Sequence, residues 1–424
     1  MNEPATQKAI TRFLLHLHPP RVNSQSIKYT RTFGLGGIAA LLFVLLFITG
    51  MLLRFIYVPS EKGAYDSISY LQSEVFFGQL LRNMHYWCGM LLVVVSFLHV
   101  IRVFYSQSIY HERRKNWLYG LLIMFLVIMS NFTGYLLPWD QLAYWAVTIM
   151  TNMLSYIPVI GDGLATLVRG GAEVNEGTLL RFYHFHTGLL PLLMVFTMSI
   201  HFWLVRKAKG VTIADSSKKE MVNTNPELVY KEIVVALSLI LLLIAFSMLL
   251  DAPLLDKANP LESPNPSKAP WYFMGFQELL LHMHPGFGIF IVPVLVTAFL
   301  IYIPYVKGLN ANVGVWFNSA VGKQVTTWSA IYAVVFTTLI IVGTEYFFKF
   351  QEWMANLPVL ITTGLLPFII YILPTYGFML LIKKKLKAGK MEVLISLVTI
   401  LLTAYLVMTL VGSLLRGEGM HLFA

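Results

Sequence analysis

The chain has 424 residues, of which 57% are hydrophobic and only 12% charged, and its formal net charge is +10. This composition excludes a soluble domain with a polar surface and predicts a polytopic membrane protein. The single cysteine, Cys88, excludes an internal disulfide and a four-cysteine iron–sulfur site. Any redox centre in this chain must therefore be held by other residue types.

Nine apolar stretches are long enough to cross a bilayer, which takes about 20 residues. We expect all-α spans near 33–57, 84–106, 117–137, 186–206, 229–250, 286–306, 326–348, 357–382 and 391–414. If the N-terminus is cytoplasmic, 22 of the 31 Lys and Arg residues lie on that side. The positive-inside rule therefore predicts a multi-pass inner-membrane protein with a cytoplasmic N-terminus, and it explains the basic charge without nucleic acid. The N-terminal region has no signal-peptide pattern, so the first helix is expected to direct insertion.

A polar linker after the fourth span and a Pro-rich loop after the fifth divide the chain. They predict a four-helix unit over 1–210, a second unit over 211–310, and further spanning helices of unassigned role over 311–424. Glu345 and Lys349, near one end of the seventh span, are a candidate ion pair worth little by itself.

Two of the spans carry paired histidines. His85 and His99 lie fourteen residues apart in the second span, and His186 and His201 lie fifteen apart in the fourth. At about 100° per residue, each separation is close to four whole turns, which places each pair on one helix face, roughly 21 to 22 Å apart. Since the second and fourth helices run parallel, His85 is expected opposite His186 near the outer surface, and His99 opposite His201 near the cytoplasmic one.

Buried histidines often only bond to neighbouring helices, but four at matched levels favour metal ligation. Imidazole on both sides of an iron porphyrin gives a six-coordinate haem that suits electron transfer. The sequence therefore predicts two haems stacked across the membrane.

Glycines and arginines accompany the histidines. Gly36 and Gly50 in the first span repeat the fourteen-residue interval, as expected where a flat ring passes close to backbone, although glycines also occur at ordinary helix contacts. Arg82 and Arg102 flank the His85/His99 span, where each could pair with a haem propionate or extend to the membrane interface.

Two segments, 130–152 and 267–285, mix aromatic residues and prolines with a few acids at the outer ends of helices. Such segments can be simple interfacial belts. However, Asp140 and Glu278 lie near Pro-Trp elements, and a carboxylate in an apolar cleft has a raised pKa that suits proton acceptance. Asp140 and Glu278 are therefore candidate catalytic residues of a quinol site.

Over residues 28–306 the sequence resembles cytochrome b of the Rieske/cytochrome b complexes, the quinol–cytochrome c oxidoreductases. The resemblance rests on four motifs: RNMH, which ends at His85 and is followed by His99, GYLLPWDQLAYWAV, LVRGG and RFYHFHTGLLP. The fifteen-residue histidine spacing and the Trp139-Asp140 pair are more similar to the plastoquinol-oxidising branch. In that branch the protein is split into two chains, whereas this chain continues.

The resemblance implies that His85 and His186 ligate an outer haem b, and that His99 and His201 ligate an inner one, both held non-covalently. It also implies a Rieske iron–sulfur protein, a c-type cytochrome subunit, quinone as a second substrate, and a dimeric complex.

The family's quinone sites are carried over by position. The outer quinol-oxidising site would include Gly134, Pro138, Trp139, Trp271, Tyr272 and the acid. Tyr272 is there a third candidate catalytic residue beside the two acids. The inner quinone-reducing site would include Arg206 and Lys207, which a positive-inside role explains equally well.

Two departures from the family pattern matter. The glutamate of the usual Pro-Glu-Trp-Tyr is replaced by Pro270, and Glu278, about two helical turns beyond Trp271, is the candidate substitute. Gly34 occupies the position where the plastoquinol branch carries a cysteine for an additional haem, so no covalent haem is expected on this chain.

Two rival functions remain at this stage. A dihaem anchor that exchanges electrons between quinone and a dehydrogenase or hydrogenase would need the histidines but not both outer segments. A proton-coupled transporter would use histidines as proton relays and would have no need of paired spacings.

Overall fold

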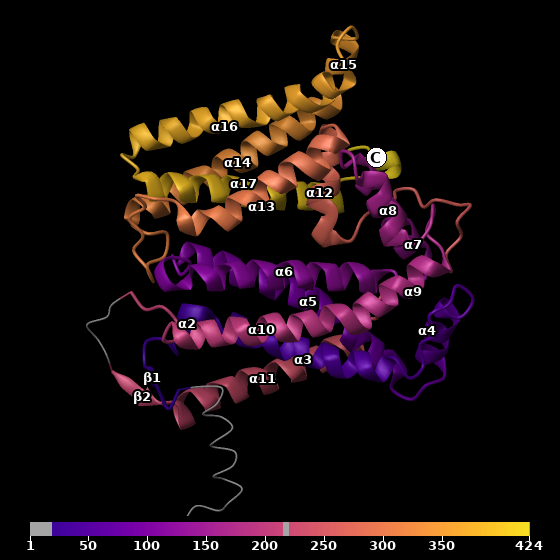
Figure 1. The fold of residues 1–424 in the computed structure, drawn as a ribbon, viewed down its shortest axis with the longest axis horizontal. Coiled ribbons are helices and arrows are strands. Elements are labelled where there is room, and N and C mark those ends of the chain that lie inside the picture. The colour runs from indigo at the N-terminus through magenta and orange to yellow at the C-terminus, as the bar shows by residue number, and fades with distance from the viewer. Residues whose placement is uncertain (1–18, 215–219, 424) are drawn as a thin grey trace, which may run out of the picture.

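The computed structural model describes residues 19–214 and 220–423, and these form an elongated bundle of helices (Figure 1). Within these residues, nine helices are long and apolar enough to cross a membrane, which confirms the predicted all-α, multi-pass architecture. Their α-helical parts are α3 (Leu35–Leu53), α5 (Gly78–Tyr105), α6 (Arg114–Tyr135), α10 (Leu190–Lys207), α11 (Thr224–Leu249), α13 (Val292–Tyr302), α14 (Ala320–Tyr346), α16 (Leu366–Lys385) and α17 (Lys390–Leu414).

Short elements connect the spanning helices. The α-helices are α2 (Tyr29–Thr32), α4 (Ala64–Ser73), α7 (Gln141–Met153), α8 (Gly161–Arg169), α9 (Glu176–His184), α12 (Trp271–His282) and α15 (Phe350–Trp353). The 3₁₀ turns are η1 (His111–Arg113), η2 (Leu154–Tyr156), η5 (Ile303–Tyr305) and η7 (Glu418–Met420). Strands β1 (Arg21–Asn23) and β2 (Met221–Asn223) pair antiparallel.

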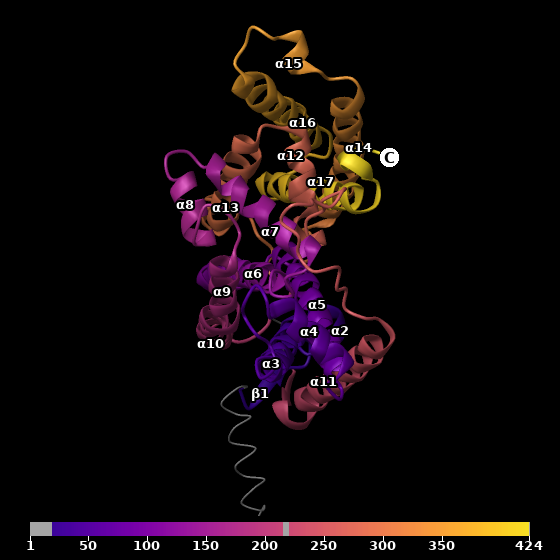
Figure 2. The same ribbon diagram turned by 90° about the vertical axis from the view of Figure 1, so that its right-hand side faces the viewer.

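The spanning helices form two groups, seen one above the other in both views (Figures 1 and 2). In the first group α3 packs along α5, α10 packs along α6, and α11 packs on α5 and α3. In the second group α17 packs against α14 and against the short helix α12. The indole N–H of Trp117 in α6 donates to the carbonyl oxygen of Leu300 in α13 at 2.7 Å and so joins the groups. The fifth spanning helix, α11, thus belongs to the first group, because it packs on α5 and α3, which precede the polar linker.

Three π-helical turns interrupt the spanning segments, and each ends two residues before a proline. A proline has no N–H and its ring collides with the carbonyl four residues earlier, and a wider turn relieves that collision. The turns are η3 (Phe185–Leu189) before Pro191, η4 (Gly286–Ile291) before Pro293, and η6 (Leu360–Leu365) before Pro367.

The turn η3 contains His186 and explains the unequal histidine spacings. A π turn takes in more residues than an α turn, so the fifteen residues from His186 to His201 span nearly the same rotation as the fourteen from His85 to His99. In a uniform α-helix the extra residue would rotate one pair by about 100° relative to the other. The uniform helix assumed for the fourth span is therefore wrong, and the local wide turn keeps the two pairs in register.

Candidate functional site

The structure brings the four histidines together in two pairs between α5 and the η3–α10 segment. The ring centroids of His85 and His186 lie 6.1 Å apart, with the ring planes at 75°. At the other end of the helices, His99 lies against Gly36 of α3 and His201 against Gly120 of α6. The 6.1 Å between the rings of His85 and His186 leaves room for a metal ion at about 2 Å from a nitrogen of each imidazole. We call the two ends of the bundle the His85 end and the His99 end.

Hydrogen bonds at the His85 end set the proton position on both imidazoles. Nδ1 of His186 lies 2.8 Å from the carbonyl oxygen of Ser130, which can only accept, so Nδ1 carries the hydrogen. Nδ1 of His85 lies 2.9 Å from the hydroxyl of Thr49, and that hydroxyl donates to the carbonyl of Leu45 at 2.8 Å. With the hydrogen on Nδ1, the Nε2 lone pair of each ring is free to ligate a metal.

Helix α3 places a glycine against each histidine of α5. A Cβ atom on Gly50 would lie 3.1 Å from Cε1 of His85, and one on Gly36 would lie 3.4 Å from Cε1 of His99. A Cβ contact at 3.1 to 3.4 Å is tighter than most real ones. The fourteen-residue glycine interval thus reproduces the fourteen-residue histidine interval on the neighbouring helix.

Helix α6 places a glycine against each histidine of the η3–α10 segment. A Cβ atom on Gly134 would lie 2.5 Å from Cε1 of His186, and one on Gly120 would lie 3.5 Å from Cε1 of His201. Gly120 was missed in the sequence, although its position fourteen residues before Gly134 repeats the interval seen in the first span. A cradle of four small residues around four imidazoles fits two flat haem rings.

The two flanking arginines have backbone partners in the structure. Arg82 donates to the carbonyl oxygens of Ala252 at 2.8 Å and Pro253 at 2.7 Å, in the loop after α11. Arg102 donates from Nε to the carbonyl of Arg31 at 2.9 Å. Both arginines are buried at opposite ends of α5. Arg82 therefore holds the loop after α11 at one end of the bundle, and Arg102 holds α2 at the other.

Asp140 caps α7 at the His85 end. One of its carboxylate oxygens accepts from the backbone N–H of Ala143 at 2.8 Å, and the other from Leu255 at 3.2 Å. Burial of the side chain raises the pKa of Asp140, and the hydrogen bonds and Arg82 only partly oppose this. The pKa of Asp140 is therefore shifted upwards, as expected for a carboxylate that accepts a proton. Trp139, beside it, is buried against Tyr144 with ring centroids 5.5 Å apart.

The two aromatic residues at the start of α12 point to different surroundings. The hydroxyl of Tyr272 is buried with no hydrogen-bond partner among the described residues, near the phenols of Tyr135 and Tyr86. Burial raises the pKa of Tyr272, so its hydroxyl keeps its hydrogen and can donate. Trp271 is half-exposed and donates its indole N–H to the sulfur of Met90 at 3.3 Å.

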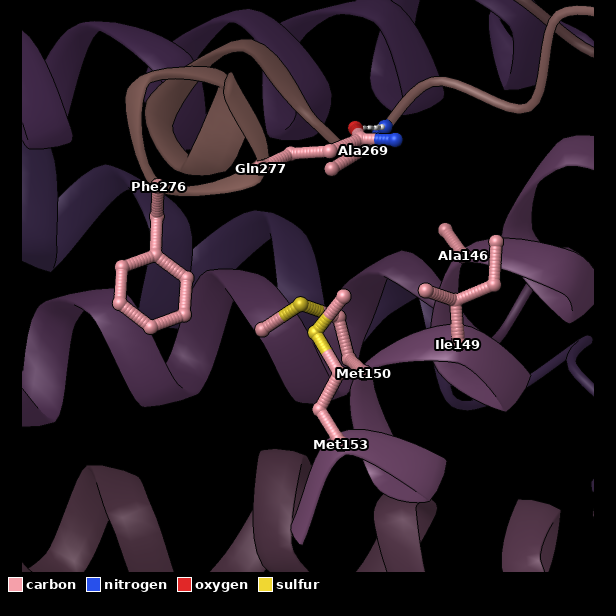
Figure 3. Close-up of a pocket in the computed structure, with 7 residues that line it drawn as sticks. All are labelled: Ala146, Ile149, Met150, Met153, Ala269, Phe276 and Gln277. Carbon is pink, nitrogen blue, oxygen red and sulfur yellow. Dashed lines mark hydrogen bonds between the residues drawn. The ribbon is translucent and has the colours of Figure 1, made fainter. Parts of the chain in front are cut away.

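A cavity of about 10 Å³ lies between α7 and α12, enough for one water molecule (Figure 3). The side chain of Gln277 spans part of it and accepts from the backbone N–H of Ala269 at 2.7 Å. None of the predicted quinol-site residues Pro138, Trp139, Trp271 or Tyr272 lines it, although all the lining residues except Met153 come from the same two segments. The lining residues are Ala146, Ile149, Met150, Met153, Ala269, Phe276 and Gln277.

Glu278 faces away from this cavity, into an ion cluster with the chain's C-terminal segment. Arg416 donates to its two carboxylate oxygens at 2.6 and 3.0 Å, and to Glu345 of α14 at 2.7 Å. Nε2 of His282 lies 3.0 Å from the carboxylate of Glu278. The side chain of Glu278 is fully buried, and that of Arg416 nearly so.

The expectation of a raised pKa at Glu278 is wrong. Burial alone would raise it, but the hydrogen bonds from His282 and Arg416 and the charge of Arg416 bring the pKa of Glu278 below its usual value. The candidate pair of Glu345 with Lys349 is also wrong, because Lys349 lies 3.6 Å from Glu352 instead. Both errors have one cause, the distant Arg416, which local sequence does not place.

The residues predicted for an inner quinone site lie in the last turn of α10, at the His99 end. The ammonium of Lys207 lies 5.1 Å from the centroid of the Trp203 ring. Both Arg206 and Lys207 are exposed, so they are accessible at that end of the bundle.

Comparison with known sequences gives three results. The family described as Cytochrome b/b6/petB matches residues 21–209. Cytochrome b6 of Prochlorococcus marinus (strain MIT 9303) is 41% identical over 189 residues, 45% of this chain and 84% of the relative. Cytochrome b6 of Synechococcus sp. (strain JA-3-3Ab) is 40% identical, over 45% of this chain and 85% of the relative.

A solved structure extends the likeness in fold to nearly the whole chain. A chain described as "Hyperthermophilic respiratory Complex III" superposes with a TM-score of 0.67 at 21% identity, covering 97% of this chain and 96% of that one. The residues matched by the family include the four histidines, the four glycines of the cradle and Asp140. The chain therefore belongs to the cytochrome b/b6 family, the haem b-binding membrane subunits of quinol oxidoreductases.

Proposed function

We propose that this protein is the dihaem cytochrome b subunit of a quinol:cytochrome c oxidoreductase in the cell inner membrane, with the N-terminus cytoplasmic. Quinol at the outer, His85 end releases two electrons and two protons. One electron goes to a Rieske iron–sulfur protein and then a c-type cytochrome subunit, and the other crosses to a quinone at the His99 end, which builds a proton gradient. The name of the structural relative, a respiratory Complex III, supports a multi-subunit assembly, which we take to be dimeric.

The observation that carries this proposal is the pair of imidazole sites in one bundle, each bordered by two glycines. Haem b bound at each pair would supply a one-electron carrier. His85 and His186 would hold one iron, and His99 and His201 the other. The Nδ1 hydrogen bonds orient the imidazoles of the first pair and leave Nε2 of each ring available to a metal, as ligands require.

We assign the outer quinol site to the region between α7 and α12. Asp140, with its raised pKa, is the candidate proton acceptor, and the free hydroxyl of Tyr272 is a candidate donor to a quinol oxygen. The cavity of about 10 Å³ cannot hold a quinol ring, so binding requires α7 and α12 to separate around Phe276 and Gln277. Gly134, Pro138, Trp139 and Trp271 would form the aromatic surroundings.

We assign the remaining parts of the chain as follows. Residues 1–210 form the dihaem domain. Residues 211–310 form the unit with the quinol-site loop, although its first helix, α11, packs on α5 and α3 of the dihaem domain. Residues 311–424 are a set of additional helices. Arg206 and Lys207 would attract quinone and protons at the inner site. No covalent haem is proposed, and Gly34, at the start of α3 with φ of 65°, lies in a conformation that would strain a cysteine there.

Reduced-minus-oxidised spectra test the central claim. The purified complex is expected to contain two non-covalent b haems per chain, measured as pyridine haemochrome, and His99→Ala is expected to contain one. His184→Ala is the matched control, because His184 lies in the same spanning segment but is exposed, and it should keep both. Absence of haem from the wild-type protein would overturn the proposal.

The second test concerns Asp140. A carboxyl group with a raised pKa must lose its proton before it can accept another, so quinol oxidation should rise with pH through that pKa. Asp140→Asn keeps an N-cap for α7 but removes the acid, and we expect at least a tenfold lower rate, without that rising limb. The pH profile of quinol oxidation is the measurement, with the exposed Asp162→Asn as control. An unchanged profile would exclude Asp140 as the acceptor.

A further inference from the structure

We propose that a hollow at the His99 end, where α6 and α13 meet, binds an anionic phospholipid by its phosphate. The hollow has a volume of about 430 Å³. Its polar lining comes from the start of α6 with the η1 turn before it, and from η5 with the residues after it. The polar lining residues are Tyr110, His111, Arg114, Tyr305 and Lys307. This site lies outside the haem and quinone sites described above.

The charge of the hollow is complementary to a phosphate. Arg114 and Lys307 supply two cations, and no acidic residue lines the hollow. The guanidinium of Arg114 lies over the ring of Tyr305, 5.6 Å from its centroid, which positions the cation without neutralising it. Lys390 brings a third cation, since its Nζ lies 3.4 Å from where a Cβ on Gly308 would be. Among the described residues, none of these three cations forms an ion pair.

The apolar surface next to the hollow suits acyl chains. On α13 and η5, Leu295, Tyr302 and Tyr305 are exposed at intervals of seven and three residues, and so form one stripe that ends at the hollow. On α6, the exposed Phe125 lies eleven residues, about three turns, from Arg114 and therefore shares its face. Because both helices span the membrane, this exposed surface faces lipid, and the phosphate site lies at its polar edge.

The position of the site favours a lipid bound between the two helix groups. The hollow takes residues from η1 and the first turn of α6 in the first group, and from η5 and the segment after it in the second. Lys and Arg are concentrated at this end, which the positive-inside rule places at the cytoplasmic leaflet, where basic hollows between spanning helices bind anionic head groups. A bound lipid would join the groups beside the contact of Trp117 with Leu300.

Lipid retention by the purified complex tests the proposal. Native mass spectrometry and thermal unfolding would be measured after delipidation, with added phosphatidylglycerol, phosphatidylcholine or inorganic phosphate. We expect phosphatidylglycerol, but not phosphatidylcholine, to raise the Tm by several degrees. We expect Arg114→Gln with Lys307→Gln to weaken its binding at least tenfold. The control is Lys383→Gln with Lys384→Gln, which removes equal charge from exposed positions at the end of α16.

The outcomes separate lipid from other anions. Equal loss of phosphatidylglycerol in both double variants would overturn the site, because it would show binding by net charge alone. Stabilisation by inorganic phosphate to the same extent would overturn the lipid assignment. The haem spectrum of each variant checks its fold, and the binding readout stays independent of the proposed redox function.

Discussion

Gly134→Ala is expected to cost the protein the haem at the His85/His186 pair while the other haem remains. The added Cβ would lie 2.5 Å from Cε1, 2.9 Å from Nδ1 and 3.1 Å from Nε2 of His186, so the imidazole must leave its position. The ring is fixed by its hydrogen bond to Ser130, and α6 packs closely against η3, so the clash is not relieved by a small shift. We expect haem content to fall from two per chain towards one.

A graded series makes this result sharper. Gly120→Ala and Gly36→Ala place the Cβ 3.5 and 3.4 Å from their histidines, so we expect both haems to be kept, with only a shifted redox potential. Gly37→Ala, in open space on α3, is the matched control and should behave as wild type. Haemochrome quantification with redox titration measures all four variants. Two unaltered haems in Gly134→Ala would contradict the cradle described above.

Arg416→Met is expected to be the most destabilising single change in the second helix group. It would leave the carboxylates of Glu278 and Glu345 without their cation, and the side chain of Glu278 is 0% exposed. Removing one partner of a buried ion pair typically costs about 3–5 kcal/mol. Glu278 lies in α12 next to Gln277, which lines the cavity. A change in the position of Glu278 would therefore disturb the proposed quinol site, so the rate of quinol oxidation should fall as well.

The matched control for Arg416 is Lys349→Met. Lys349 pairs with Glu352 on the surface at 3.6 Å, and such pairs contribute at most about 1 kcal/mol. Thermal unfolding and quinol oxidation would be measured for both variants, and equal Tm shifts would contradict the importance of the buried cluster. Arg416→Met combined with Glu278→Gln should recover part of the loss, because it removes one of the unpaired charges.

The difference in stability between Arg416→Met and the wild-type protein is expected to depend on pH. The pKa of Glu278 is lowered in the folded protein, so its pair with Arg416 stabilises the fold above the unfolded value of 4.5. This contribution is lost as the pH falls through the lowered pKa. In Arg416→Met the buried carboxyl gains stability on protonation instead, so the gap between variant and wild type should narrow in acid.

The spans and the histidine levels followed from the sequence because they depend on local properties. Hydropathy and length decide whether a helix crosses a membrane, and the distribution of Lys and Arg predicts its orientation. The glycines at positions 36 and 50 signalled a close approach for the same local reason. Gly120 carried the same signal, an interval of fourteen residues to Gly134, and could have been found by it.

Contacts between distant segments could not be obtained in this way. Asp140 and Glu278 look alike in the sequence, since both are acids near a Pro-Trp element. The structure gives them pKa shifts of opposite sign, because Asp140 has mainly backbone donors whereas Glu278 binds Arg416, 138 residues away. The sign of a pKa shift depends on burial and on the nearest charges, neither of which is a local property.

The sequence by itself determined the membrane-spanning architecture, the family resemblance and the two levels of histidine, because periodicity and motif are written into consecutive residues. Only the tertiary structure decided that a π turn at His186 keeps the two pairs in register, that α17 and Arg416 hold α12, and that basic loops from two helix groups enclose one hollow. These features depend on which helices become neighbours, and packing across the whole chain sets that choice.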